Sequence, residues 1–201
     1  MYIDKPVKAY LDDLAARKPA PGGGSAAALT AAVGAGLLSM VANYTAGNPK
    51  YEDRDGKMAA LLSRAESFRA GLQSLIDKDV EAYGRLSDAV KKSDKNDKEL
   101  EALYKEAVRV PFEVCMMSAE CLRLCKTAAE CGNKNLITDT AIAAIFLEGA
   151  FFSAKFNVYL NLKFVKDADH VEKIHSALAP LEEELPRLKE DILEICEEVI
   201  S

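Results

Sequence analysis

The stretch that most constrains the fold is a proline- and glycine-rich loop that runs directly into a long helix of small residues. Residues 19–24 read Pro-Ala-Pro-Gly-Gly-Gly, and residues 25–45 continue as a run dominated by Ala, Gly and Leu. The three glycines free the backbone, and Ser25 stands where an N-cap is expected. Because side chains this small let other helices approach closely, we expect the helix to pack inside a bundle.

The loop also has the features of a binding corner. A helix N-terminus presents free N–H groups and the positive end of the helix dipole, which suit an anion or a carbonyl oxygen. No Lys-Ser/Thr pair follows the glycines and no predicted strand precedes them, so neither a P-loop nor a dinucleotide-binding fingerprint is indicated. The alternative is structural: the loop only lets a tightly packed helix begin.

Length and composition favour one globular domain over residues 1–201. Hydrophobic residues make up 49% of the 201 residues, which is enough for a sizeable core. The net charge is −6 and no basic cluster is longer than Lys91-Lys92, so we expect no nucleic-acid partner. Five irregularly spaced cysteines indicate reduced thiols, and the first residues carry no apolar leader segment. We therefore expect a cytoplasmic protein.

Two apolar stretches raise the question of a membrane. Residues 26–42 are uncharged but short and dominated by Ala and Gly, and residues 141–162 contain Glu148 and Lys155. A span needs about 20 predominantly apolar residues. We expect both stretches to be helices of a soluble protein, with no membrane partner.

Apolar residues recur every three or four positions along most of the chain, and no stretch has the pattern of a strand. We therefore expect an all-α fold, an up-and-down multihelical bundle with kinked long helices. Pro111 should kink or break its helix, and Pro180 and Pro186 should interrupt the last one. That last helix has an apolar pattern that suits an antiparallel bundle or a dimer seam. The expected helices cover residues 6–17, 25–45, 53–91, 99–130, 138–164 (with Thr138 as N-cap) and 171–199, and a turn covers 92–98.

Asp79 is the candidate acid, because it occupies a position on the apolar face of the helix over 53–91. On that pattern its neighbour Asp77 points away from the face. Burial of a carboxyl group disfavours its charged form and raises its pKa, and a carboxylic acid that is protonated near neutral pH can act as a general acid. The alternatives are that the apolar face of this helix is open to solvent at Asp79, or that Asp79 is buried as the cap partner of another helix.

Paired side chains give two further candidates. Asn157 and Asn161 lie four residues apart and share a helix face, where their amides suit the edges of a heterocyclic ring. Asn133 and Asn135, taken alone, are explained by ordinary turn chemistry. The pair formed by cysteines 121 and 125 is better explained by core packing than by metal binding, so we expect no metal site.

Six segments, taken in their order along the chain, carry a further signal: Pro21-Gly-Gly-Gly-Ser25, Met40-Val-Ala-Asn-Tyr-Thr45, Leu75-Ile-Asp-Lys-Asp-Val-Glu-Ala-Tyr83, Ala107-Val-Arg-Val-Pro111, Gly132-Asn-Lys-Asn135 with Thr138-Asp139, and Asn157-Val-Tyr-Leu-Asn-Leu162. Together they resemble the cyclodeaminase/cyclohydrolase family of folate enzymes. This family includes the cyclodeaminase domain of formiminotransferase-cyclodeaminase and stand-alone bacterial methenyltetrahydrofolate cyclohydrolases. The resemblance extends to about Asp167, with Thr138 in place of a more usual Ser and Tyr44 in place of a common Leu.

The resemblance implies an all-helical homodimer that acts on tetrahydrofolate one-carbon derivatives, with no cofactor beyond that substrate. It implies a catalytic acid at Asp79. The activity we expect is that of a 5,10-methenyltetrahydrofolate cyclohydrolase, which interconverts the methenyl and 10-formyl compounds. The alternatives are a formiminotetrahydrofolate cyclodeaminase and, from another class, a non-catalytic helical oligomerisation module. The substrate-binding residues that it implies are Gly22, Gly23, Gly24, Ser25, Asn43, Asn135, Asp139, Asn157 and Asn161.

Overall fold

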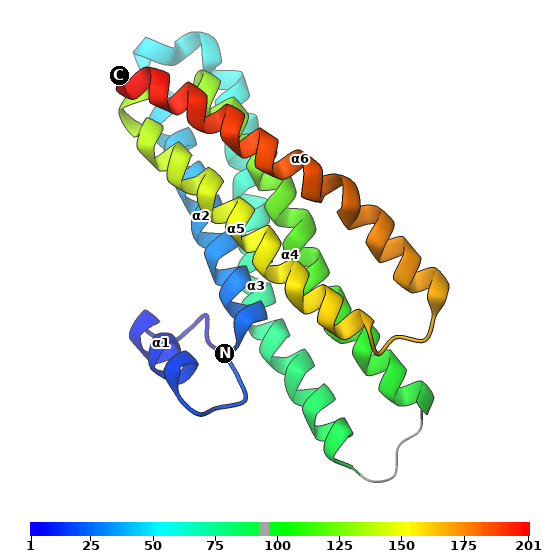
Figure 1. Ribbon diagram of the computed structural model, residues 1–201. Coiled ribbons are helices and arrows are strands. Elements are labelled where there is room, and N and C mark those ends of the chain that lie inside the picture. The colour runs from blue at the N-terminus through cyan, green and yellow to red at the C-terminus, as the bar shows by residue number, and fades with distance from the viewer. Residues whose placement is uncertain (93–96) are drawn as a thin grey trace.

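The computed structural model describes residues 1–92 and 97–201, and within them it contains helices and no strand (Figure 1). Five long helices run up and down as a bundle, which confirms the expected fold class. Two short 3₁₀ segments, η1 (Pro49–Arg54) and η2 (Lys134–Leu136), lie in the connections. The helices are α1 (Val7–Ala15), α2 (Gly23–Thr45), α3 (Asp55–Lys91), α4 (Asp97–Cys131), α5 (Ile137–Leu162) and α6 (Ala168–Ile200).

The small-residue helix α2 lies among the other helices, as its composition predicts. It packs against α3, α4 and α5, and most of its alanines are buried. At Gly34 a Cβ atom would lie 2.8 Å from Cγ of Leu147 on α5. The close approach of α2 and α5 at this point therefore requires glycine.

The predicted apolar face of α3 is buried over most of its length, including Met58, Leu72 and Ile76. The spacing of apolar residues in the sequence also puts Tyr83 and Val90 on this face, but both are exposed near the C-terminal end of the helix. Of the predicted turn over 92–98, residues 93–96 lie outside the described residues. Lys92 is non-helical, and α4 already begins at residue 97.

The prolines do not interrupt the helices, contrary to the prediction for Pro180 and Pro186. The helix α6 is continuous from Ala168 to Ile200, and α4 is continuous through Pro111. An interior proline removes one backbone hydrogen bond, and its ring crowds the carbonyl group four residues earlier. In α6 a complete apolar face (including Leu178 and Leu185) packs against α4 and α5 and keeps the helix intact.

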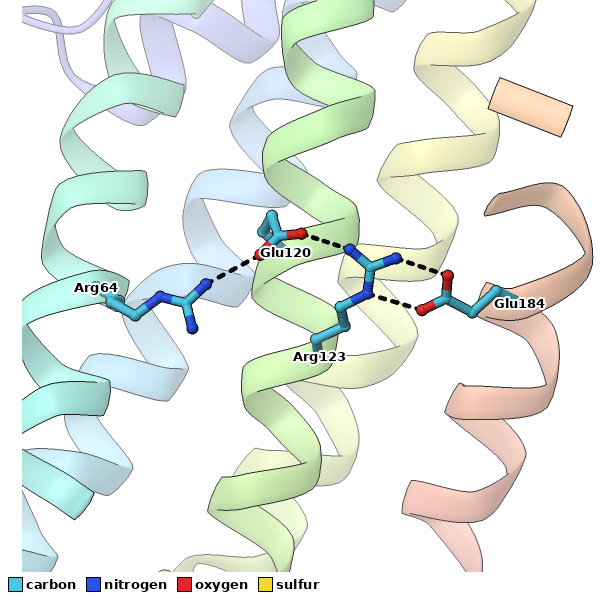
Figure 2. A network of polar contacts seen from close by, with 4 residues as sticks. All are labelled: Arg64, Glu120, Arg123 and Glu184. Carbon is cyan, nitrogen blue, oxygen red and sulfur yellow. Dashed lines mark hydrogen bonds and ion pairs between the residues drawn. The ribbon is translucent and has the colours of Figure 1, made fainter. Parts of the chain in front are cut away.

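Ion pairs join three helices across the outside of the bundle (Figure 2). Glu120 on α4 accepts a hydrogen bond from Arg64 on α3 at 2.9 Å and another from its neighbour Arg123. Arg123 also donates two hydrogen bonds, of 2.7 and 2.6 Å, to Glu184 on α6. These groups are partly exposed, so we expect the network to contribute little to the stability of the fold.

The first helix, α1, lies beside the bundle near the N-terminal end of α2 (Figure 1). The sequence pattern places Val7, Tyr10, Leu11 and Leu14 on one face of this helix, and of these only Tyr10 is buried. The other three are exposed because α1 makes few contacts with the other helices.

Candidate active site

A pocket of about 210 Å³ lies at the N-terminal end of α2, where four helices and the glycine loop meet. The loop contributes Pro19 and Ala20, and the first turn of α2 contributes the three consecutive glycines. The lining side chains from the other helices are Asp79, Ala82, Tyr83 and Leu86 of α3, Ala107 of α4, and Asn157, Leu160 and Asn161 of α5.

The carboxyl group of Asp79 sits directly against the first turn of α2. A Cβ atom on Gly24 would lie 2.1 Å from Oδ1 of Asp79, so a side chain at that position would displace the carboxyl group. Burial raises the pKa of Asp79 above its ordinary value, and a hydrogen bond from the backbone N–H of Ser25 partly offsets that rise. Asp79 therefore accepts a cap hydrogen bond from the first turn of α2 and also lines the pocket. The sequence left a cap partner and a candidate acid as alternatives, but one carboxyl group can occupy both positions.

Ser25 does not serve as the N-cap of α2. The N-cap is Gly22, and Ser25 is the third residue of the helix, with its side chain fully buried. The hydroxyl of Tyr10 lies 3.2 Å from the hydroxyl of Ser25 and donates a hydrogen bond to it. The prediction failed because the glycines themselves adopt helical geometry, so the helix begins two residues earlier.

Asp77 does not point away from the protein, contrary to the sequence prediction. Its side chain is buried, with 5% of the residue exposed. The carboxylate accepts hydrogen bonds from the backbone N–H groups of Tyr2 and Ile3, the latter at 3.3 Å. Asp77 therefore anchors the N-terminal segment, and Asp79, two residues later, faces the pocket.

The two asparagines of α5 both line the pocket, as their spacing predicts. Nδ2 of Asn157 donates to the backbone oxygen of Ser153 at 3.3 Å, and Nδ2 of Asn161 donates to the backbone oxygen of Ala107 at 2.9 Å. A Cβ atom on Gly23 would make an ordinary contact of 3.7 Å with Nδ2 of Asn157. The glycine turn, Asp79 and the two amides thus lie around one cavity.

The other predicted binding residues lie at the opposite end of the bundle. Asn43 is near the C-terminal end of α2, about 30 Å along the helix from Gly23. Asp139 is in the first turn of α5, about 27 Å along that helix from Asn157, and Asn135 precedes it in η2. A single chain therefore does not bring Asn43, Asn135 and Asp139 together with Asp79.

The residues next to this distant group have the structural role that the sequence suggested. The side chain of Asn133 accepts hydrogen bonds from the N–H of Asn135 at 3.1 Å and from the hydroxyl of Tyr51 at 3.3 Å. Cys121 and Cys125 are fully buried in the core, as expected. Across the described residues, no group of three His, Cys, Asp or Glu side chains is arranged to hold a metal ion.

Comparison with known proteins decides the family. Residues 6–180 match the formiminotransferase-cyclodeaminase family. The chain belongs to this family. A methenyltetrahydrofolate cyclohydrolase from Methylorubrum extorquens is 34% identical over 195 residues, which cover 94% of each chain. The formimidoyltransferase-cyclodeaminase of Mus musculus is 33% identical over 90% of this chain.

The relatives are enzymes of two kinds. The chain covers 35% of the length of the Mus musculus protein, so it spans about a third of that longer relative. A crystal structure of a formiminotetrahydrofolate cyclodeaminase from Thermotoga maritima has a TM-score of 0.93 and 31% identity, with complete coverage of both chains. The chain is therefore similar over nearly all of its length to the Methylorubrum extorquens and Thermotoga maritima proteins.

Some pocket residues were not anticipated from the sequence. Leu86 and Ala107 line the cavity, and so does Tyr83, although its ring is half-exposed. Apolar helix positions carry no signal of their own for a binding site. For Ala107 the sequence held one indication. Pro111 stands four residues later and has no backbone N–H to donate to the Ala107 carbonyl group.

Proposed function

We propose that this chain is a 5,10-methenyltetrahydrofolate cyclohydrolase and that the pocket around Asp79 is its active site. The observation that carries the proposal is a half-buried carboxyl group with a raised pKa, placed in one cavity with two side-chain amides and a glycine turn. The full-length similarity to the Methylorubrum extorquens cyclohydrolase supports the assignment of the substrate. The fold similarity to the Thermotoga maritima cyclodeaminase favours that activity as the second candidate.

The two reactions need the same proton transfer. In the cyclohydrolase reaction, water adds to the carbon between N5 and N10 and loses a proton. The tetrahedral product then opens when its hydroxyl group loses a proton to become the formyl oxygen, the bond from carbon to N5 breaks and N5 gains a proton. In the cyclodeaminase reaction, N10 attacks the formimino carbon and loses its proton, the imine nitrogen gains a proton to become an amino group, and that group leaves as ammonia after it gains a second proton. Each path needs one group that can take up and return a proton at this carbon.

Asp79 is the group that we assign to this role. Because its pKa is raised, the protonated form of Asp79, which can donate a proton, persists to higher pH than in an ordinary aspartate. After donation, the hydrogen bond from the N–H of Ser25 stabilises the carboxylate. Asn157 and Asn161 supply uncharged hydrogen-bonding groups for the pterin ring. The first turn of α2 lines the same cavity, and its N–H groups other than that of Ser25 suit the formyl oxygen. We propose that the reaction runs in the cytoplasm without a metal ion.

Two assays on the purified chain test this proposal. Loss of the methenyl chromophore at near-neutral pH, faster than the rate without protein, is the result expected of a cyclohydrolase. Release of ammonia from formiminotetrahydrofolate would instead favour the cyclodeaminase. A chain that is inactive in both assays would contradict the assignment and favour the oligomerisation module.

We further propose that the chain is a homodimer whose seam is the outer face of α2 and α5. An uncharged apolar stripe on α5 follows a spacing of three and four residues, and Phe156 and Leu160 in it are 72% and 55% exposed. On α2, Val33 is also exposed and Leu37 is half-buried. An apolar patch of this length marks an interaction surface. The stripe on α5 consists of Ile142, Ile145, Phe146, Phe156 and Leu160, with the exposed residues Gly149 and Ser153 at the positions between them.

A second copy is the occupant that this face fits. By length and composition, α2 and the segment Lys134–Leu162 could each cross a membrane, but the chain itself packs α3 and α4 against α2, and α4 and α6 against α5. The apolar face of α6 is already used inside the chain, which leaves α2 and α5 for the seam. The pocket also needs completion, since about 210 Å³ is below the ~300 Å³ typical of a small-molecule site.

An antiparallel pairing would complete the pocket from the second copy. Asp139 and Asn157 are 18 residues apart, which is five turns of helix, so both lie on the same side of the stripe. A two-fold axis across α5 near residue 148 would bring the second copy's own Asp139 beside Asn157. Asp139 is half-buried and Asn43 exposed, and neither has a hydrogen-bond partner among the residues described here.

Mixing two inactive variants tests the shared site. We expect Asp79→Asn and Asp139→Asn to be inactive as separate homodimers. Because random mixing gives half heterodimers with one intact site each, about a quarter of wild-type activity should return. No recovery, or an active Asp139→Asn, would refute the contribution of the second copy. Two results for the wild-type chain would refute the dimer seam. One is a monomer at micromolar concentration in light scattering, and the other is sedimentation of the chain with phosphatidylcholine vesicles.

A further inference from the structure

Pro111 lies inside α4 and is buried, although a proline at this position weakens a helix. Proline has no backbone N–H, so the carbonyl group four residues earlier loses its usual helical partner. In α4 that carbonyl belongs to Ala107, which lines the pocket. The proline thus leaves one hydrogen-bond acceptor free at the wall of the candidate active site.

The free acceptor is taken by a side chain of the pocket. Nδ2 of Asn161 donates a hydrogen bond to the Ala107 oxygen at 2.9 Å. A carbonyl oxygen can only accept, so the nitrogen of the amide must face Ala107, and the orientation of the amide is fixed by chemistry. Oδ1 of Asn161 has no hydrogen-bond partner in the described part of the chain and remains available to a ligand.

The two prolines of α6 have no such arrangement. They free the carbonyl groups of Ser176 and Glu182, and no side chain among the described residues donates to either oxygen. Pro180 is also exposed, whereas Pro111 is buried. The coupling between an interior proline and a pocket amide is therefore particular to α4.

We propose that Pro111 is a positioning residue that keeps the Ala107 oxygen free so that Asn161 presents its own oxygen to the substrate. The partner of that oxygen is the N–H edge of a heterocyclic ring, and the assignment of the ring rests on the proposed function. A fixed acceptor discriminates against ligands that lack the donor, because one buried polar group is then left unpaired.

The test exchanges the proline for a residue that supplies the missing N–H. In Pro111→Ala the backbone can bond to Ala107 and displace Asn161, so we expect KM for the methenyl substrate to rise at least tenfold, with a smaller change in kcat. The thermal midpoint should not fall, since alanine is the better helix former. Pro180→Ala is the matched control and should keep wild-type kcat and KM.

A double variant separates positioning from packing. If Pro111 acts through Asn161, then Pro111→Ala combined with Asn161→Ala should be no worse than Asn161→Ala alone. Additive losses, or a folded Pro111→Ala with wild-type KM, would overturn the proposal. Should Pro111→Ala not fold, Asn161→Asp tests the same bond from the other side, because it places an oxygen against the Ala107 oxygen. Wild-type KM in Asn161→Asp would also overturn it.

A measurement without substrate separates this proposal from the proposed function. An inactive wild-type chain would contradict only the folate assignment. The side-chain amide signals of Asn161 in ¹⁵N NMR should still shift in Pro111→Ala and stay unchanged in Pro180→Ala. Unchanged signals in Pro111→Ala would overturn the positioning role, whatever the activity.

Discussion

Gly24 offers the sharpest steric test of the site, because its missing side chain leaves room for the carboxyl group of Asp79. In Gly24→Ala the new Cβ atom would lie 2.1 Å from Oδ1 and 2.7 Å from Cγ of Asp79. Ordinary van der Waals contact begins at 3.4 Å, so the carboxyl oxygen must move by about 1.3 Å. A displacement of about 1 Å in a reacting group costs roughly 100-fold in rate.

The fold should survive this change. Alanine is favoured over glycine inside a helix by ~1 kcal/mol, while overpacking costs ~1–3 kcal/mol, so the net loss of stability is at most about 2 kcal/mol. We therefore expect kcat to fall about 100-fold in a protein whose helical circular dichroism is close to that of the wild type.

The assay is the loss of the methenyl chromophore under saturating substrate. Gly56→Ala is the control, because a Cβ atom there meets nothing within 4 Å and the residue lies in the first turn of α3, far from the pocket. A folded Gly24→Ala enzyme with kcat within threefold of the wild type would refute the argument that Gly24 and Asp79 form one tightly fitted unit.

Two further predictions concern metal ions and pH. A chelator should leave activity unchanged, because the proposed chemistry uses a carboxylic acid and amides; activity lost with the chelator and restored by zinc would contradict this. Hydrogen bonds from Arg69 and Ser39 lower the pKa of Glu66 to about 2, so its stabilisation is present above its ordinary pKa of 4.5 and is lost as pH falls towards 2. Since both partners are partly exposed, Arg69→Ala should cost less than ~1 kcal/mol at pH 7 and nothing measurable at pH 2 in urea titrations.

The sequence predicted those features that depend on local periodicity. The apolar face of α3 placed Asp79 against the interior, and the four-residue spacing of Asn157 and Asn161 placed both amides on one wall. The small residues of α2 predicted its packed position. Each of these inferences uses residues within one helix, where geometry follows directly from spacing.

The failures involve partners that are distant in sequence. Asp77 is buried because it meets backbone donors 75 and 74 positions away, and nothing near it in the sequence indicates them. Likewise, α6 passes through Pro180 because packing against α4 and α5 outweighs the lost hydrogen bond. The role of Asp139 stays a prediction, because position along one helix does not reveal whether a second copy would bring this residue to the pocket.

The central claim is that Asp79 transfers the proton, and Asp79→Asn tests it most directly. Burial raises the pKa of Asp79, so its charged form destabilises the fold above that pKa, and the penalty disappears once the group is protonated at low pH. Asp79→Asn should therefore be at least as stable as the wild type at pH 7, which excludes unfolding as the cause of lost activity.

The decisive measurement is kcat for loss of the methenyl chromophore in Asp79→Asn, beside Glu81→Gln as an exposed control on the same helix. Because Asp77 anchors the N-terminal segment, it is not a suitable control. The account predicts a fall in kcat of roughly 10²–10⁴-fold with a much smaller change in KM, and wild-type values for Glu81→Gln. A folded Asp79→Asn enzyme that keeps more than about a tenth of the wild-type kcat would contradict the account.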